Sequence, residues 1–251
     1  MEGLILFILA LLPVVILGYY TYSKDDEKEP KKLLIELFLG GLLSAILTVV
    51  LSLLVRVVFP TFAGEVAYFG PIKLLIYTFV VVAFIEELCK FIILYLISYH
   101  NKEYDQLYDM VVYAVFVALG FAWIENLLYV YEGGVTIAIT RLVFAVPTHA
   151  SVAVFMGYYL SLSKLSELYK KEKLRRKYLL YSILIPTLLH GVYDFIAYSS
   201  NLVFIYLLFL FSCYLFWKAN RRLVQMSKVE KSLLVKEEKQ EKSNEDDIEI
   251  I

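Results

Sequence analysis

Four consecutive apolar stretches of the chain contain ionisable side chains of the types that catalyse hydrolysis. They read Glu86-Glu87-x-x-Lys90, Phe121-x-x-x-Glu125, Pro147-x-His149-Ala150 and His190-x-x-x-Asp194. A charged residue at the centre of a membrane helix costs about 2.5–3.5 kcal/mol on insertion scales, so such residues usually face a partner or a wet cavity. Carboxylates and imidazoles that meet at one depth can hold a water molecule and polarise it beside a peptide carbonyl.

The glutamate pair lies in the middle of its apolar run. Adjacent side chains on a helix point about 100° apart, so Glu86 and Glu87 cannot share one role. Lys90 is at i+4 from the first and i+3 from the second, and it can neutralise one of them. The other carboxylate is then free to act as a general base or as a metal ligand. The spacing does not say which glutamate is which.

The neighbouring residues suggest a role in the site for His190 more clearly than for His149. His190 and Asp194 are four residues apart and project from one helix face, so the carboxylate can orient the imidazole or both can bind one metal. Taken singly, His149 fits an interhelical hydrogen bond and Glu125 fits an interfacial carboxylate. Arg141 is expected to anchor the outer end of its helix. Together, however, these groups favour an active site within the membrane.

The elements that must position these residues are predicted to be membrane helices. The chain has 251 residues, of which 60% are hydrophobic, whereas soluble domains usually contain about 45–50% apolar residues. The apolar segments are 3–22, 33–58, 72–99, 110–131, 135–161, 178–198 and 202–218. Each approaches or exceeds the ~20 residues that span a bilayer. We therefore predict an all-α polytopic bundle of about seven transmembrane helices.

Basic residues predict the orientation of the bundle. Lysine and arginine occur in the first, third and fifth loops and in the tail, whereas the loops near 59–71, 132–134 and 199–201 have none. By the positive-inside rule the N-terminus is outside and the C-terminus is cytoplasmic. Residues 1–220 form the predicted transmembrane domain, and 221–251 form a charged, mobile cytoplasmic tail.

Composition also bears on other classes of function. Cys89 and Cys213 both lie in apolar runs, which disfavours a disulfide framework or a cysteine metal site. An ion-coupled transporter could use buried carboxylates and histidines as a proton relay. The halves of the sequence, however, show no paired repeat with interrupted helices at matching positions. No nucleic-acid partner is expected.

The order and placement of the four motifs resemble those of the PrsW-type intramembrane proteases. This family is related to the type II CAAX prenyl endopeptidases, which carry a similar Glu-Glu motif, an F-x-x-x-H motif and a final His motif. The resemblance covers about 75–200. Because the second motif ends in Glu125 rather than His, the PrsW branch is favoured over the prenyl-protein branch.

The resemblance implies a bacterial plasma-membrane protease that makes the first, extracytoplasmic cut in a membrane-spanning anti-sigma factor during stress signalling. It implies Glu86, Glu87, Glu125 and His190 as catalytic residues, with Lys90 and Asp194 in supporting roles. The family is classed with metalloproteases, so Zn²⁺ is an expected cofactor. The candidate zinc ligands are His149, His190, Asp194 and Glu87. Three alternatives stay open: a metal-free glutamate mechanism, a CAAX-type peptidase acting on another peptide, and the transporter.

Overall fold

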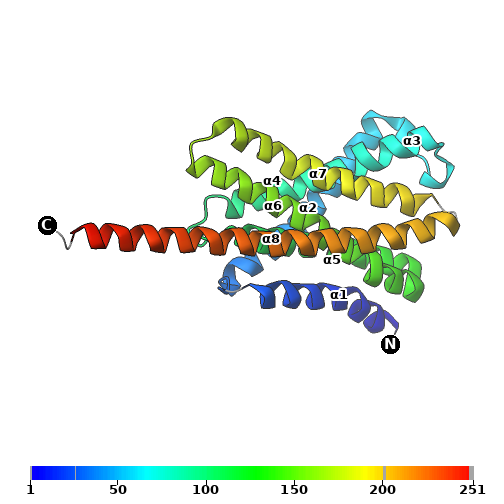
Figure 1. The fold of residues 1–251 in the computed structure, drawn as a ribbon. Coiled ribbons are helices and arrows are strands. Elements are labelled where there is room, and N and C mark those ends of the chain that lie inside the picture. The colour runs from blue at the N-terminus through cyan, green and yellow to red at the C-terminus, as the bar shows by residue number, and fades with distance from the viewer. Residues whose placement is uncertain (1, 26, 200–201, 249–251) are drawn as a thin grey trace.

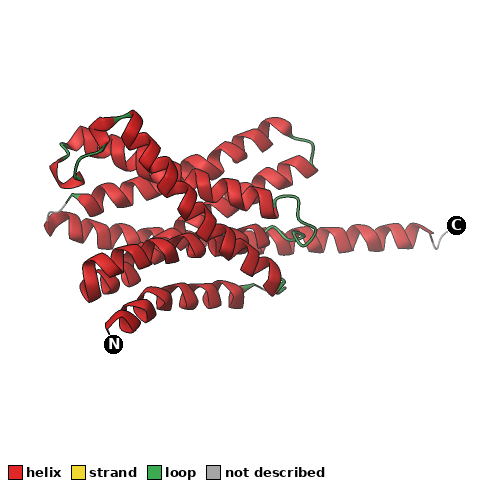
Figure 2. Cartoon of the chain, turned by 180° about the vertical axis from the view of Figure 1, so that it is seen from behind, coloured by secondary structure: helices red, strands yellow, loops and turns green. Residues whose placement is uncertain are grey.

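The computed structural model describes residues 2–25, 27–199 and 202–248, and within these ranges the chain is helical with no β-strand (Figures 1 and 2). The α-helices are α1 (Glu2–Lys24), α2 (Lys31–Val58), α3 (Pro71–Ile76), α4 (Phe84–Ser98), α5 (Asp109–Thr140), α6 (Val146–Leu168), α7 (Glu172–Tyr198) and α8 (Leu202–Ile248). Five helical segments are long and apolar enough to cross a membrane: 3–24, 31–58, 109–168, 172–198 and 203–226. The predicted all-α membrane bundle is therefore confirmed.

Two parts of the bundle differ from single uninterrupted spans. The predicted span 72–99 consists of α3, a π-helical stretch η3 (Tyr77–Ala83) and α4. The predicted spans 110–131 and 135–161 meet at Gly134, whose backbone is not helical. The chain turns back there, because Asn126 and Arg141, on either side of Gly134, share a hydrogen bond of 2.9 Å. Gly134 has φ of 70°, a conformation that glycine adopts without steric cost. Seven crossings, with the N-terminus outside, stay a prediction.

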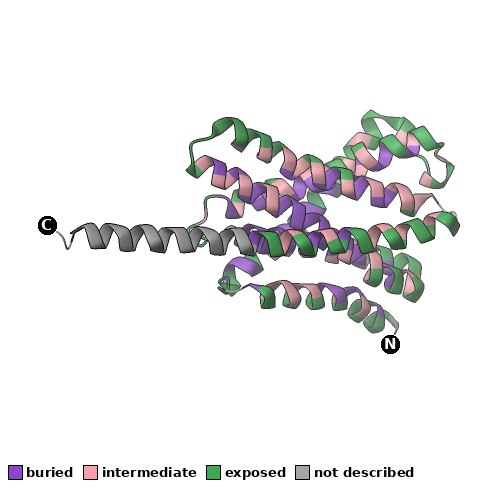
Figure 3. Cartoon of the chain, viewed as in Figure 1, coloured by how far each residue is buried: buried purple, intermediate pink, exposed green. Residues whose placement is uncertain are grey.

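Helix α5 forms the centre of the bundle. From Asp109 to Ala122 every side chain except Phe116 is buried, which is typical of a helix enclosed on all sides. Helices α1, α2, α4 and α6 pack around it, and buried residues concentrate in the middle of the bundle (Figure 3). Large apolar side chains on the outer faces, such as Val57 and Leu96, are exposed. Such a surface suits lipid as the surrounding solvent.

The connections between helices lie at the two ends of the bundle in a way that agrees with the predicted grouping of basic and uncharged loops. The α1–α2 and α6–α7 connections lie at the end from which α8 extends, whereas the α2–α3 connection lies at the opposite end (Figure 1). Helix α8 continues to Ile248 through most of the predicted tail. The mobility predicted for 221–251 stays a prediction, and 249–251 fall outside the described residues.

Two glycines allow α2 and α5 to touch through their backbones. A Cβ atom added at Gly41 would lie 2.1 Å from the carbonyl oxygen of Val117, and one added at Gly120 would lie 2.0 Å from that of Phe38. Small residues at membrane-helix interfaces permit such close approach. The contact holds α2 against the helix that carries Glu125.

Gly41→Ala is expected to destabilise the protein by about 1–3 kcal/mol, because its methyl group meets backbone that cannot rotate away. Thermal unfolding in detergent would measure this loss. Gly70→Ala is the control, because nothing lies within 4 Å of a Cβ atom at that position. Equal unfolding temperatures for the two variants would contradict the prediction.

A group of carboxylates is buried at the end of the bundle that bears the basic loops. The Tyr113 hydroxyl donates a hydrogen bond to Glu29, which lies between α1 and α2. Asp25 and Asp109 are buried nearby. Burial raises the pKa of the Glu29 carboxyl, and the carboxylates of Asp25 and Asp105 raise it further. The fold therefore favours the protonated form of Glu29.

Because the folded-state pKa of Glu29 lies above its unfolded value of about 4.3, the protonated group stabilises the fold most below that value. This stabilisation is lost as the pH rises through the folded pKa. Glu29→Gln, which retains an acceptor for Tyr113, should therefore raise the unfolding temperature at pH 8. The gain should shrink towards pH 4. A difference independent of pH would show that Glu29 stays charged in the folded protein.

Candidate active site

Two π-helical stretches precede the elements that carry the site. Stretch η3 leads into Glu86 and Glu87 in the first turn of α4, and η4 (Arg141–Ala145) leads into α6 and His149. Pro147 has no backbone N–H, so the regular helical hydrogen bond is missing there, and a π-turn is one way to accommodate the gap. Inserted π-turns often occur at functional sites, because they turn the following side chains to a new face.

Helix α7 is held close to η3 by a glycine. A Cβ atom at Gly191 would lie 2.6 Å from Cδ1 of Phe79, so only glycine fits without displacing that ring. The adjacent His190 is thereby brought against the first turn of α4.

Glu87 is fixed by two donors. Its Oε1 atom lies 2.8 Å from the Lys90 ammonium and 2.8 Å from Nδ1 of His190. The side chain is only 1% exposed. Glu87 is thus a buried acceptor that orients an imidazole.

Glu86 has looser contacts than its neighbour. Its Oε2 atom is 3.5 Å from Nζ of Lys90 and 3.7 Å from Nε2 of His190, which are ion-pair distances too long for hydrogen bonds. This oxygen is buried and has no hydrogen-bond partner among the described residues. The two glutamates therefore differ as their angular separation predicts.

A second line of polar contacts runs through Glu125. Its Oε2 atom lies 2.7 Å from Nε2 of His149 and 3.0 Å from Nη2 of Arg141. The Arg141 Nε atom donates to Asn126 at 2.9 Å, and Asn126 donates to the carbonyl of Ala10 on α1. The interpretation of Arg141 as an outer anchor is wrong, because its guanidinium pairs with Glu125 in the site. The available signal was that Arg141 and His149 are the only basic residues in 133–163, which contains no acidic residue.

Lys90 connects the contacts of Glu87 and His190 with those of Glu125 and His149. Its ammonium lies 3.2 Å from Nδ1 of His149 and 4.0 Å above the centre of the Phe121 ring. The rings of His149 and His190 are 4.9 Å apart, edge to face. Asp194 Oδ2 lies 3.5 Å from Nε2 of His190. The structure thus brings together all seven residues that the sequence analysis selected.

Four of these residues could hold a metal ion. One ligand atom from each of Glu86, Glu87, His149 and His190 lies within 4.8 Å of the others, and all four side chains are buried. Two carboxylates and two imidazoles form a donor set that suits zinc. A cation or a water molecule held here would satisfy the Glu86 oxygen that lacks a hydrogen-bond partner among the described residues. Asp194, which the sequence analysis included among the ligands, is not in this group.

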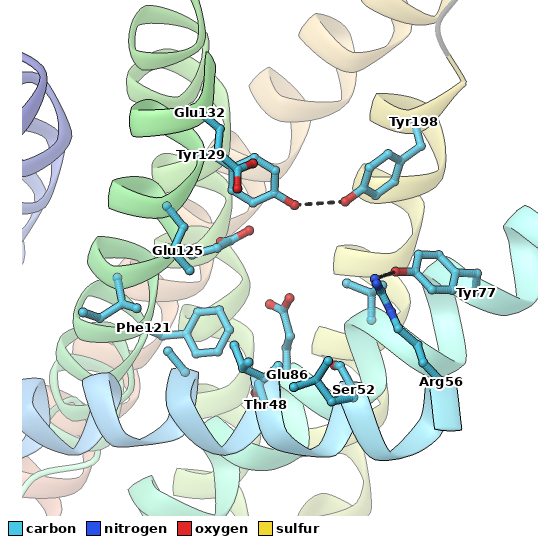
Figure 4. Close-up of a pocket in the computed structure, with 16 residues that line it drawn as sticks. Thr48, Ser52, Arg56, Tyr77, Glu86, Phe121, Glu125, Tyr129, Glu132 and Tyr198 are labelled. Atoms are coloured by element: carbon cyan, nitrogen blue, oxygen red, sulfur yellow. Dashed lines mark hydrogen bonds between the residues drawn. The ribbon is translucent and has the colours of Figure 1, made fainter. Parts of the chain in front are cut away.

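A cavity of about 490 Å³ opens over the site between α2, η3, α5 and α7 (Figure 4). Glu86 points into it from one side and Glu125 from another, with Phe121 beside them. Further out, Tyr129 and Tyr198 form a hydrogen bond of 3.2 Å. Arg56, which also lines the cavity, donates to Tyr77 at 2.8 Å. These outer residues were not predicted, because the sequence does not show which polar groups at helix ends face inward.

Comparison with known proteins gives the family. Residues 29–217 match the family model described as PrsW family intramembrane metalloprotease. A protein named Protease PrsW from Clostridioides difficile (strain 630) is 38% identical over 221 residues, covering 86% of this chain and 88% of its own length. Proteins of the same name from Oceanobacillus iheyensis and Bacillus subtilis (strain 168) are 34% and 33% identical, covering 85% and 84% of this chain and 95% and 91% of their own lengths. No solved structure matches the chain. The chain belongs to the PrsW family of intramembrane metalloproteases, and it is a multi-pass bacterial membrane peptidase.

Proposed function

We propose that the chain hydrolyses a peptide bond of a membrane-protein substrate in the cavity above Glu86, as the first cut in an anti-sigma factor. The observation that carries this proposal is the position of Glu86. Its carboxylate faces the cavity and retains an oxygen without a hydrogen-bond partner among the described residues. That oxygen can hold a water molecule and accept its proton as the water attacks the substrate carbonyl.

The neighbouring groups suit supporting roles in this reaction. Glu87 accepts from Nδ1 of His190, which leaves Nε2 facing Glu86 and Asp194. From there His190 can stabilise the oxyanion or give a proton to the departing amine. Lys90 offsets the charge of the adjacent carboxylates.

If zinc is bound, Glu87, His149 and His190, three of the four donors described above, would hold it and would leave Glu86 as the base. The chemistry that zinc supplies at such sites is polarisation of a carbonyl and activation of water. Glu125, paired with Arg141, then keeps His149 oriented through Nε2. This is the usual arrangement in which a carboxylate outside the ligand set fixes a ligating imidazole.

The placement of the cavity supports a cut on the extracytoplasmic side. Arg56 in the last turn of α2 and Tyr198 at the end of α7 line it. Both helices end at loops without lysine or arginine, near 59–71 and 199–201. With seven crossings, the positive-inside rule places those loops outside.

The direct test is co-expression with a membrane-spanning anti-sigma factor encoded in the same genome, tagged at both ends. Immunoblotting should show an extracytoplasmic fragment with the wild-type chain and none with Glu86→Gln. If the anti-sigma factor stays intact while another peptide is cut, the CAAX-type alternative replaces this substrate. If no peptide is cut by folded protein, the proposed function fails.

A further inference from the structure

The cavity has an unequal distribution of charge. Its lining includes three carboxylates, Glu86, Glu125 and Glu132, and one cation, Arg56. Glu125 is already paired with Arg141 and His149. Arg56 has no carboxylate within ion-pair distance in the part of the chain that the structure describes, and its side chain is exposed.

Arg56 is nevertheless held in position. Its Nη2 atom donates to the hydroxyl of Tyr77 at 2.8 Å, so the guanidinium is turned towards η3 and the cavity rather than along the helix axis (Figure 4). Tyr77 is buried and packs edge-on against Phe69, at 5.2 Å between ring centres. The remaining guanidinium N–H groups are fixed in a fork that matches the two oxygens of a carboxylate.

Figure 4 shows where a substrate would meet this group. The Tyr129–Tyr198 hydrogen bond crosses the upper part of the view, Arg56 and Tyr77 lie below Tyr198, and Glu86 lies to the left of Arg56. Arg56 and Glu86 line the same cavity, so a peptide whose scissile bond sits over Glu86 would place a side chain from near the cut by Arg56. A carboxylate there would find its ion-pair partner, whereas a lysine or arginine would meet a like charge.

We propose that Arg56 determines substrate specificity by binding an acidic side chain close to the scissile bond. This inference rests on the proposed function and adds the chemistry of the substrate. Simpler reasons for a basic residue in the last turn of α2 are interaction with the helix dipole and with lipid headgroups. Neither of them predicts a preference among substrates.

The test uses single-span reporter substrates in proteoliposomes with the full-length protein. The reporters differ only in carrying Asp, Asn or Lys at one position near the cut, and each nearby position is tried in turn. At one position, wild-type kcat/KM should be at least about tenfold higher for Asp than for Lys. Arg56→Glu should reverse this order. Arg56→Gln should abolish the preference.

Lys73→Glu is the matched control, since it makes the same change of charge on α3 without lining the cavity. It should keep the wild-type preference, whereas a reversal here would indicate long-range charge and overturn the role of Arg56. If Arg56→Glu does not fold, Arg56→Gln decides the question. An undiminished preference for Asp in that variant overturns the inference but leaves the proposed function standing. Failure of folded wild-type protein to cut any reporter overturns both.

Discussion

Glu86→Gln is expected to lower kcat for peptide cleavage by about 10²–10⁴-fold, the usual contribution of a general base. The amide keeps the size of the side chain but cannot accept a proton from water. The protein should still fold, because Oε2 makes no hydrogen bond within the described residues and only long ion-pair contacts with Lys90 and His190. The unfolding temperature and detergent elution profile should therefore match those of the wild type, and cleavage of a tagged substrate by purified protein measures the loss.

Glu87→Gln is the informative companion to this variant. Glu87 accepts hydrogen bonds from both Lys90 and His190 at 2.8 Å, and it is more deeply buried than Glu86. Its replacement leaves the Lys90 ammonium with weaker partners, so we expect a lower unfolding temperature as well as lower activity. Full activity in Glu86→Gln, with none in Glu87→Gln, would reverse the two roles.

The helical nature of the fold could be predicted from hydropathy, since bilayer thickness sets the length of an apolar helix. The site residues could be selected because an ionisable group inside an apolar run is costly to bury in a membrane and usually has a function. His149 illustrates the strength of this signal. Alone it fits a hydrogen bond between helices, but the structure places it between Lys90 and Glu125.

The rotation of each helix about its axis could not be predicted. Stretches η3 and η4 change the face on which the following residues lie, and no periodicity in the sequence marks where they begin. Arg141 was misassigned because the turn at Gly134 brings it back beside Glu125 and Asn126, which the sequence does not show. The different surroundings of Glu86 and Glu87 likewise depend on the approach of α7 to η3, which the packing of Gly191 against Phe79 permits.

Removal of the bound metal is expected to abolish peptide cleavage. We expect purified protein to contain about one zinc ion per chain, measured by plasma mass spectrometry, and His190→Ala to lose it. His100→Ala is the matched control, because His100 is the one histidine outside the site and stacks edge-on against Tyr99 instead. A chelator should abolish cleavage and added zinc should restore it.

Lys90 makes this expectation more specific. Its ammonium now bridges Glu87 and His149, two of the four candidate ligands, at 2.8 and 3.2 Å. A zinc ion and this ammonium would share the same donors, so Lys90→Met should bind zinc more tightly in competition with a chelator. Weaker binding would mean instead that Lys90 keeps the carboxylates in place for the metal. Wild-type protein that cleaves without zinc and resists chelation would assign the activation of water to Glu86 and His190 alone.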